Sequence, residues 1–142
     1  MFRSLSTVSF YAADLEAAAK WYTDVLGVAP YFSVPGYIEF RVGDLQHELG
    51  IIDSAYAGSE LSRTPAPATT GTAGSIVFWQ VDDLQSTLDQ LLATGATLHD
   101  APRDRGEGFI TASVIDPFGN ILGIMDNPHT RAILDARRPA GG

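Results

Sequence analysis

Polar side chains able to bind or transform a small molecule are concentrated between residues 37 and 48. In a strand over residues 37–42, alternation places Tyr37, Glu39 and Arg41 on one face and three apolar residues on the other. A second strand over residues 45–52 places Gln46 and Glu48 on its polar face in the same way. A carboxylate there can bind a cationic or hydrogen-bonding group, or act as a general base if burial raises its pKa.

Structural roles remain open for the same charged residues. Glu48 can pair with Arg41 or with another neighbour across the hairpin. Glu39 and Arg41 lie on the same predicted face, and a carboxylate–guanidinium pair between them is a second structural interpretation. The sequence alone therefore does not separate a ligand-binding face from a set of internal ion pairs.

Composition excludes several classes of partner. The 142 residues include 17 Asp+Glu and 9 Lys+Arg, a net charge of −8, which repels nucleic-acid phosphates and anionic lipid headgroups. The absence of cysteine excludes a thiol nucleophile and a thiolate metal site. No segment reaches the roughly 18 to 20 continuous apolar residues of a membrane span, and the first residues lack a signal-peptide core. We expect a cytoplasmic protein that binds neither nucleic acid nor membrane.

The chain contains an internal repeat, since Asp83 lies 69 residues after Asp14 and its neighbours match as well. Each copy predicts a strand, an aspartate that caps a helix, an amphipathic helix and a glycine at the helix end. The helices are expected over residues 14–26 and 83–94. The matching positions are Val8 with Val77, Phe10 with Trp79, Asp14 with Asp83 and Leu15 with Leu84.

Three short strand-like runs follow each helix, separated by turn residues. The pattern is therefore βαβββ twice, an α+β fold in which the helices cover one side of each sheet and the other sides enclose a cleft. We expect one domain over residues 1–142, with modules at about 5–53 and 75–128, a linker at 54–74 and a C-terminal tail at 129–142 that frays over residues 137–142. The expected strands cover residues 28–34, 37–42, 45–52, 96–99, 109–115 and 120–126.

The cleft is expected to be polar on the side of the first module and largely apolar on the side of the second. Such a lining suits a small amphipathic organic ligand. The predicted ligand-binding residues are Thr7, Ser9, Tyr11, Tyr37, Glu39, Arg41, Gln46, Glu48, Ile76, Phe78, Gln80, Ile121, Gly123 and Met125.

Two further segments have both a functional and a structural interpretation. Residues 116–120, Asp-Pro-Phe-Gly-Asn, fit a turn that enters the last strand. Residues 103–108 hold two arginines and two glycines and could close over an anionic ligand, but a solvated hairpin connection is the simpler interpretation.

The chain resembles the vicinal oxygen chelate superfamily, which includes glyoxalase I, extradiol dioxygenases and bleomycin-resistance proteins. The resemblance covers roughly residues 5–128 and implies a glyoxalase/bleomycin-resistance-like cleft and a homodimer, in some members formed by exchange of modules. Because the superfamily hosts many unrelated functions, the resemblance carries the fold rather than one activity. The residues that carry it are Ala13–Leu15 with Trp21–Gly27, His47–Gly50, Val81–Leu84 through Gly95-Ala96, and Asp116–Asn120.

Catalytic members of this superfamily hold a divalent metal in the cleft, and the resemblance places the four ligand positions on Thr7, Glu48, Ile76 and Gly123. Only Glu48 retains a metal-ligand side chain, whereas a divalent ion needs about three protein ligands. We therefore expect neither a metal at this site nor another cofactor. The three histidines do not replace the missing ligands at the usual site: His47 points away from its neighbour Glu48, His99 lies near a loop, and His129 follows the last strand.

These observations predict a metal-free protein that binds a small amphipathic or cationic organic molecule. Two enzymatic alternatives stay open. The first is a metal-free isomerase or lyase with Glu48 as its catalytic base. The second is a metal-dependent lyase or dioxygenase with unusual ligands, such as His47 or His129 with carboxylates. The sequence does not decide whether the protein is an enzyme.

Overall fold

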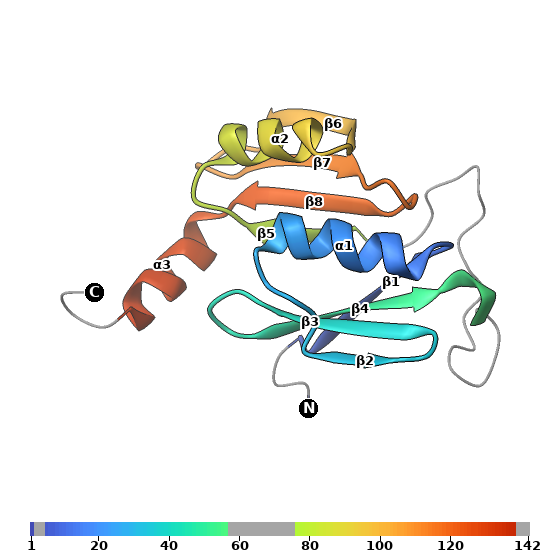
Figure 1. The fold of residues 1–142 in the computed structure, drawn as a ribbon. Coiled ribbons are helices and arrows are strands. Elements are labelled where there is room, and N and C mark those ends of the chain that lie inside the picture. The colour runs from blue at the N-terminus through green and yellow to red at the C-terminus, as the bar shows by residue number, and fades with distance from the viewer. Residues whose placement is uncertain (2–4, 57–75, 139–142) are drawn as a thin grey trace. The chain divides into compact units, whose positions relative to one another are not determined.

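The computed structural model describes Met1 and residues 5–56 and 76–138 (Figure 1). Most of the expected linker and the last four residues of the tail lie outside the described residues. In chain order the elements are β1 (Thr7–Ala12), α1 (Leu15–Leu26), β2 (Phe32–Val34), β3 (Tyr37–Val42), β4 (His47–Asp53), a 3-10 turn η1 (Ser54–Tyr56), β5 (Val77–Gln80), α2 (Leu84–Ala93), β6 (Thr97–Asp104), β7 (Ile110–Ile115), β8 (Ile121–Asp126) and α3 (Pro128–Arg137).

The strands form two four-stranded sheets, ordered β1-β4-β3-β2 and β5-β8-β7-β6. Each sheet belongs to one compact unit: unit 1 comprises residues 1–73 with 118–120, and unit 2 comprises residues 74–117 with 121–142. β1 pairs with β4, and β5 pairs with β8, in the parallel direction. All the other neighbouring strands are antiparallel. The expected α+β fold of two βαβββ modules is confirmed.

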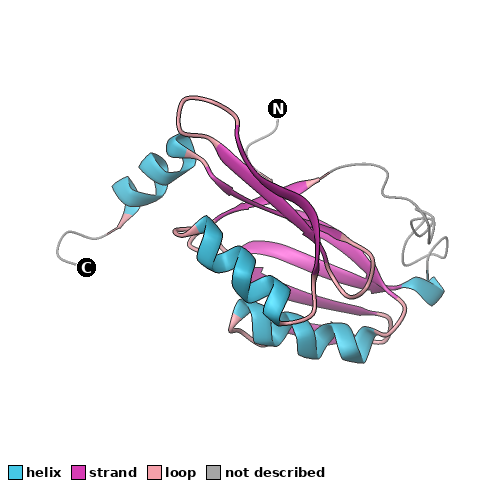
Figure 2. Ribbon diagram, turned by 90° about the horizontal axis from the view of Figure 1, so that it is seen from above, coloured by secondary structure: helices cyan, strands magenta, loops and turns pink. Residues whose placement is uncertain are grey.

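In unit 1, helix α1 packs against β3 and β4 (Figures 1 and 2). The helix begins at Asp14, whose carboxylate accepts the Ala17 N–H at 2.9 Å, and ends at Gly27, whose φ of +70° suits a residue without a Cβ. Tyr22 from the helix and Phe40 from β3 are fully buried between the two layers. The apolar face of the strands therefore forms the core, and the polar face is left on the other side of the sheet.

Unit 2 is built in the same way, with α2 packed against β7 and β8 (Figure 1). Asp83 caps this helix by accepting the Ser86 N–H at 2.9 Å, as the repeat predicts. Leu88 and Leu91 of the helix lie in the core with Val114 of β7. Both helix-capping aspartates are thus structural residues.

Residues 116–120 form the predicted turn, and its last residue makes a long-range contact within unit 1. The Asn120 amide accepts the Tyr11 N–H at 3.2 Å and donates to the Tyr11 carbonyl at 2.8 Å. Asn120 is 8% exposed. Its side chain therefore supplies the two hydrogen bonds that a neighbouring strand would offer to β1 at this position.

Several element boundaries differ from the sequence-based predictions. The strand expected over 28–34 is limited to β2, and the one expected over 96–99 extends to Asp104 with two irregularities in its pairing. The strand expected from residue 45 begins at His47, because Gln46 has a φ of +54° in the preceding turn. The expected tail contains helix α3, in which no residue is buried.

Within the described ranges, no helix combines the length and the apolar character needed to cross a membrane.

Candidate functional site

The polar face of the unit 1 sheet gathers side chains from three adjacent strands. In the register of the sheet, Thr7 of β1, Glu48 of β4 and Arg41 of β3 lie side by side. The next row along this face contains Ser9, Gly50 and Glu39, and the row after it Tyr11, Ile52 and Tyr37. The sequence pattern placed these residues of β1, β3 and β4 on the correct face.

A tyrosine that the sequence reasoning missed joins the two carboxylates. The Tyr31 hydroxyl lies 2.5 Å from Glu39 Oε2 and 2.6 Å from Glu48 Oε2. Tyr31 precedes β2 and is 42% exposed. Strict alternation with Phe32, which pairs with Glu39, would have placed Tyr31 on the opposite face. Because Tyr31 lies before β2, the alternation of side chains along the strand does not apply to it, and its hydroxyl can reach the polar face.

Two more hydroxyl groups bind the remaining carboxylate oxygens. Thr7 Oγ1 donates to Glu48 Oε1 at 2.9 Å, and the Tyr37 hydroxyl donates to Glu39 Oε1 at 2.7 Å. The hydroxyls of Thr7, Tyr31 and Tyr37 thus contact the four oxygens of Glu39 and Glu48, and a hydrogen bond from Ser6 also stabilises the Glu48 carboxylate. Since the Tyr31 hydroxyl has one proton, it can donate to only one of its two carboxylate neighbours at a time.

The hydrogen bonds lower the pKa of the carboxyl group of Glu48 and raise the pKa values of the tyrosine hydroxyls. Donation from Tyr31, followed by donation from Thr7, lowers the pKa of Glu48. The hydrogen bonds to Glu39 and then to Glu48 raise the pKa of Tyr31 to about 12. Burial, followed by the hydrogen bond to Glu39, raises the pKa of Tyr37. Glu48 is thus ionised at neutral pH, and the hypothesis of a base with a burial-raised pKa is wrong in direction.

Gly50 provides the space that Tyr37 occupies. A Cβ at this buried position would lie 2.7 Å from Tyr37 Cε2 and 2.9 Å from Tyr37 Cζ. The Tyr37 side chain can therefore lie across β4 and bring its hydroxyl to Glu39. Any larger residue at position 50 would displace this ring.

Arg41 does not form the predicted ion pair with Glu39. Its guanidinium carbon lies 4.0 Å from the centroid of the Tyr31 ring, a cation–π arrangement. The residue lies opposite Glu48 in the sheet, and its charge contributes to the lowered pKa of Glu48. Gln46, predicted to line the site from a strand, instead donates to the Gly43 carbonyl at 2.9 Å within its turn.

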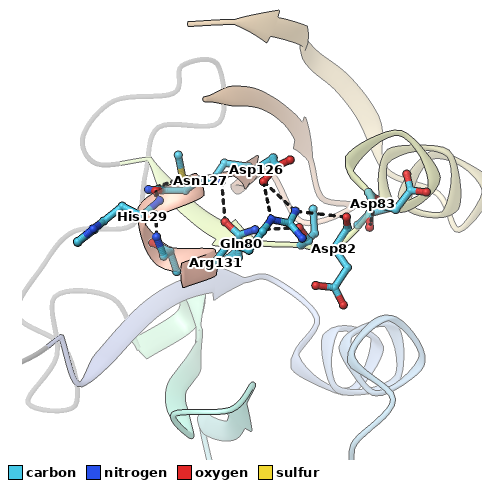
Figure 3. A network of polar contacts seen from close by, with 11 residues as sticks. Gln80, Asp82, Asp83, Asp126, Asn127, His129 and Arg131 are labelled. Carbon is cyan, nitrogen blue, oxygen red and sulfur yellow. Dashed lines mark hydrogen bonds and ion pairs between the residues drawn. The ribbon is translucent and has the colours of Figure 1, made fainter. Parts of the chain in front are cut away.

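The corresponding face of unit 2 carries Phe78, Gln80, Gly123 and Met125. Gln80 is occupied by the start of α3, because its Oε1 accepts the Asn127 N–H at 2.7 Å (Figure 3). The face also includes the hydroxyls of Thr111 and Ser113, which lie opposite Met125 and Gly123 on β7. It is therefore more polar than predicted. Contacts of the predicted residues of either unit with a ligand stay predictions.

The residues at the family's metal positions do not fit a divalent ion. The Thr7 hydroxyl donates a hydrogen bond to Glu48, and the Ile76 side chain has no atom that can coordinate a metal. In the sheet register of unit 1 the partner of Glu48 is Thr7, whereas in unit 2 Gly123 is paired with Phe78 and Ile76 precedes β5. A Cβ at Gly123 would lie 2.6 Å from the Val77 carbonyl oxygen and from Phe78 Cδ1. Among the described residues, no three His, Cys, Asp or Glu side chains are grouped to hold a metal.

The arginines of the hairpin between β6 and β7 have internal partners. Arg103 Nε donates to Asp100 at 2.9 Å, and Arg105 Nε donates to Thr111 Oγ1 at 3.0 Å. Gly106 and Gly108 have positive φ angles of 93° and 86°, which a tight turn requires. These contacts favour the interpretation of a solvated hairpin connection.

The two βαβββ units give this protein an α+β fold, and the comparisons with known proteins identify its family. The model of the Glyoxalase/Bleomycin resistance protein/Dioxygenase superfamily matches residues 4–124, and the chain belongs to this superfamily. A comparison with curated proteins finds no match.

Solved structures with the same fold come from several bacteria. A glyoxalase-related enzyme from Fulvimarina pelagi is 22% identical with a TM-score of 0.69, covering 89% of this chain and 90% of that one. A lactoylglutathione lyase from Agrobacterium tumefaciens is 20% identical with a TM-score of 0.66, covering 87% and 93%. A glyoxalase/bleomycin resistance protein/dioxygenase family enzyme from Burkholderia phytofirmans PsJN is 22% identical with a TM-score of 0.65, covering 87% and 98%. At these identities the likeness concerns the fold.

Proposed function

We propose that this protein binds a small cationic or amphipathic organic molecule without a metal, at the polar face of unit 1. The observation that carries the proposal is the approach of Glu39 and Glu48 to one phenolic hydroxyl, that of Tyr31. The single Tyr31 proton faces two carboxylate oxygens, so an ammonium or amidinium group can supply the N–H donor that one of these oxygens lacks.

The lowered pKa of Glu48 favours binding over general-base catalysis. A base is most effective when its pKa lies near the working pH, whereas the hydroxyls of Tyr31 and Thr7 stabilise the carboxylate form of Glu48. A carboxylate that is ionised at neutral pH is better suited to hold a cation. The donor set at the family's metal positions likewise supports a role that does not depend on a divalent ion.

The proposal is tested by ligand-detected NMR and calorimetry with benzylamine and benzamidine, using benzyl alcohol as the neutral analogue, in the presence of EDTA. We expect the cationic probes to bind and benzyl alcohol to bind more weakly. Glu48→Gln should weaken the cations about tenfold or more, since it removes a charge-assisted hydrogen bond. The matched control is Asp44→Asn, an exposed residue of the same hairpin with the same change in net charge.

Two results would contradict the proposal. One is the absence of binding for every cationic probe. The other is binding that Glu48→Gln and Asp44→Asn reduce equally, because this would assign the effect to net charge rather than to the site.

A further inference from the structure

Arg41 brings a positive charge to the face of unit 1 that carries Glu39 and Glu48. It lies in the same row of the sheet as Thr7 and Glu48. It is also the only arginine or lysine in the described strands of unit 1. The polar face therefore holds both signs of charge, with two carboxylates and one guanidinium.

The Arg41 side chain is exposed and stacks on an aromatic ring. Arg41 takes part in none of the ion pairs found among the described residues. Its guanidinium carbon lies 4.0 Å from the centroid of the Tyr31 ring, and its side chain also interacts with the Tyr31 hydroxyl. Since a guanidinium carries several N–H groups around the edge of its plane, stacking on a ring leaves donors for a further acceptor.

Tyr31 brings the two kinds of charge close together. Its hydroxyl lies 2.5 Å from Glu39 Oε2 and 2.6 Å from Glu48 Oε2, and its ring face carries Arg41. The carboxylates and the guanidinium therefore lie on two sides of one phenol group. Because Tyr31 is 42% exposed, this group is accessible to a small molecule.

We propose that the ligand is a zwitterion, whose ammonium group is held by Glu39 and Glu48 and whose carboxylate is held by Arg41. An α-amino acid is the simplest compound of this class. The inference rests on the proposed function, because it assumes that the ammonium group binds at the two glutamates.

The chemistry of Arg41 favours a carboxylate as the second group. A planar guanidinium binds a carboxylate through two parallel N–H···O bonds, which a ligand with only an ammonium group would leave unused. The stacking on Tyr31 orients the guanidinium before the ligand arrives, so less side-chain freedom is lost on binding. Without Arg41, a ligand carboxylate would meet the two glutamates alone and be repelled.

Phenylglycine and benzylamine are matched probes, because phenylglycine is benzylamine with a carboxylate on the carbon that bears the amine. Phenylglycinol has a neutral hydroxymethyl group in place of this carboxylate. We expect calorimetry at neutral pH to show one enantiomer of phenylglycine binding about fivefold more tightly than benzylamine, the upper range for a solvent-exposed ion pair. Phenylglycinol, which has no negative charge, should lack this advantage.

Substitutions of Arg41 should change the preference between the two probes. In Arg41→Gln the order should reverse, since the carboxylate of phenylglycine then faces only negative charges. Arg41→Lys keeps the charge but loses the planar fork, so it should retain only part of the preference. The matched control is Lys20→Gln, an exposed residue of α1 with the same change in net charge, which should keep the wild-type preference. Circular dichroism of the variants checks that they fold.

The possible results separate this inference from the proposed function. If benzylamine binds and both enantiomers of phenylglycine bind equally or more weakly, the zwitterion is wrong and the cation site stands. The same holds if Arg41→Gln and Lys20→Gln reduce the preference for phenylglycine equally. If neither benzylamine nor phenylglycine binds, both proposals are wrong.

Discussion

Hydrogen bonds from the hydroxyls of Tyr31 and Thr7 keep the carboxylate of Glu48 ionised. The alternation of residues 45–52 was enough to place Glu48 on the polar face, and Thr7 beside it follows from the parallel pairing of β1 with β4. Tyr31 could not be predicted, because its contact depends on where β2 begins rather than on a repeating pattern. For the same reason the direction of the Glu48 pKa shift was missed: the sequence suggests burial, whereas hydrogen-bond donors dominate.

Removing a partner of Tyr31 should change its titration. In Glu39→Gln, the hydrogen bond that raises the Tyr31 pKa most is weakened, so this pKa should fall from about 12 toward the ordinary value of 10.0. The folded state favours the protonated phenol, and its contribution to stability is complete below pH 10 and lost as the pH rises toward 12. NMR of the labelled tyrosine ring carbon measures the pKa, with Asp44→Asn as control. An unchanged value would contradict the hydrogen-bond assignment.

Binding of a cationic ligand should depend on pH through Glu48. Because its pKa is lowered from 4.5, benzylamine affinity should be constant between pH 8 and 5 and should fall only below 4.5. In Thr7→Val, which removes one hydrogen-bond donor, the loss should begin at higher pH. Calorimetry of both proteins over this range provides the comparison. Loss of binding near pH 6 in the wild type would point to a different group.

Among the elements, those with complete sequence signals were predicted closely. α1 and α2 combine a capping aspartate, an amphipathic run and a glycine at or just beyond the end, and β3 combines alternation with turns on both sides. α3 was missed, although Asn127 followed by Pro128 is a favourable helix start. The extra length of β6 was missed because nearly all of its residues are exposed.

The packing of Tyr37 on β4 predicts a coupled pair of substitutions. Gly50→Ala should lower the free energy of unfolding by about 1–3 kcal/mol, since the new methyl group overlaps the Tyr37 ring. In a Tyr37→Ala background this cost should largely disappear, which urea denaturation of the four proteins would measure.

Unit 2 offers a matched contrast. At Gly123 the nearest atoms include the Val77 carbonyl oxygen of the backbone as well as the Phe78 ring. Phe78→Ala should therefore fail to rescue Gly123→Ala. If Phe78→Ala reduced the cost of Gly123→Ala as much as Tyr37→Ala reduces that of Gly50→Ala, the overlap with the Val77 carbonyl oxygen would not contribute to the cost.

At the scale of the whole molecule, the repeat of two βαβββ modules was readable because each copy carries its own complete set of signals. The donor set at the four family positions was readable too, since it depends on residue identity alone. What the sequence could not supply is the network of side-chain contacts within each unit, because Tyr31, Gln80 and Asn120 act on residues brought close only by folding.

The donor set gives a prediction for the intact protein. Treatment with EDTA should leave the melting temperature and the affinity for benzylamine unchanged, and added Zn²⁺ should not raise the melting temperature. An ion bound specifically to the native state, at 100 times its dissociation constant, would add about 2.7 kcal/mol of stability. A saturable rise in melting temperature with Zn²⁺, reversed by chelator, would contradict this expectation.

The contact of Asn120 with Tyr11 also bears on how the protein behaves at high concentration. β1 forms one edge of its sheet, and edge strands with open N–H and carbonyl groups recruit strands from other molecules. The Asn120 amide occupies both groups of Tyr11. The turn at residues 116–120 thus leaves no open N–H or carbonyl at Tyr11 with which a strand of another molecule could pair at this point of the edge.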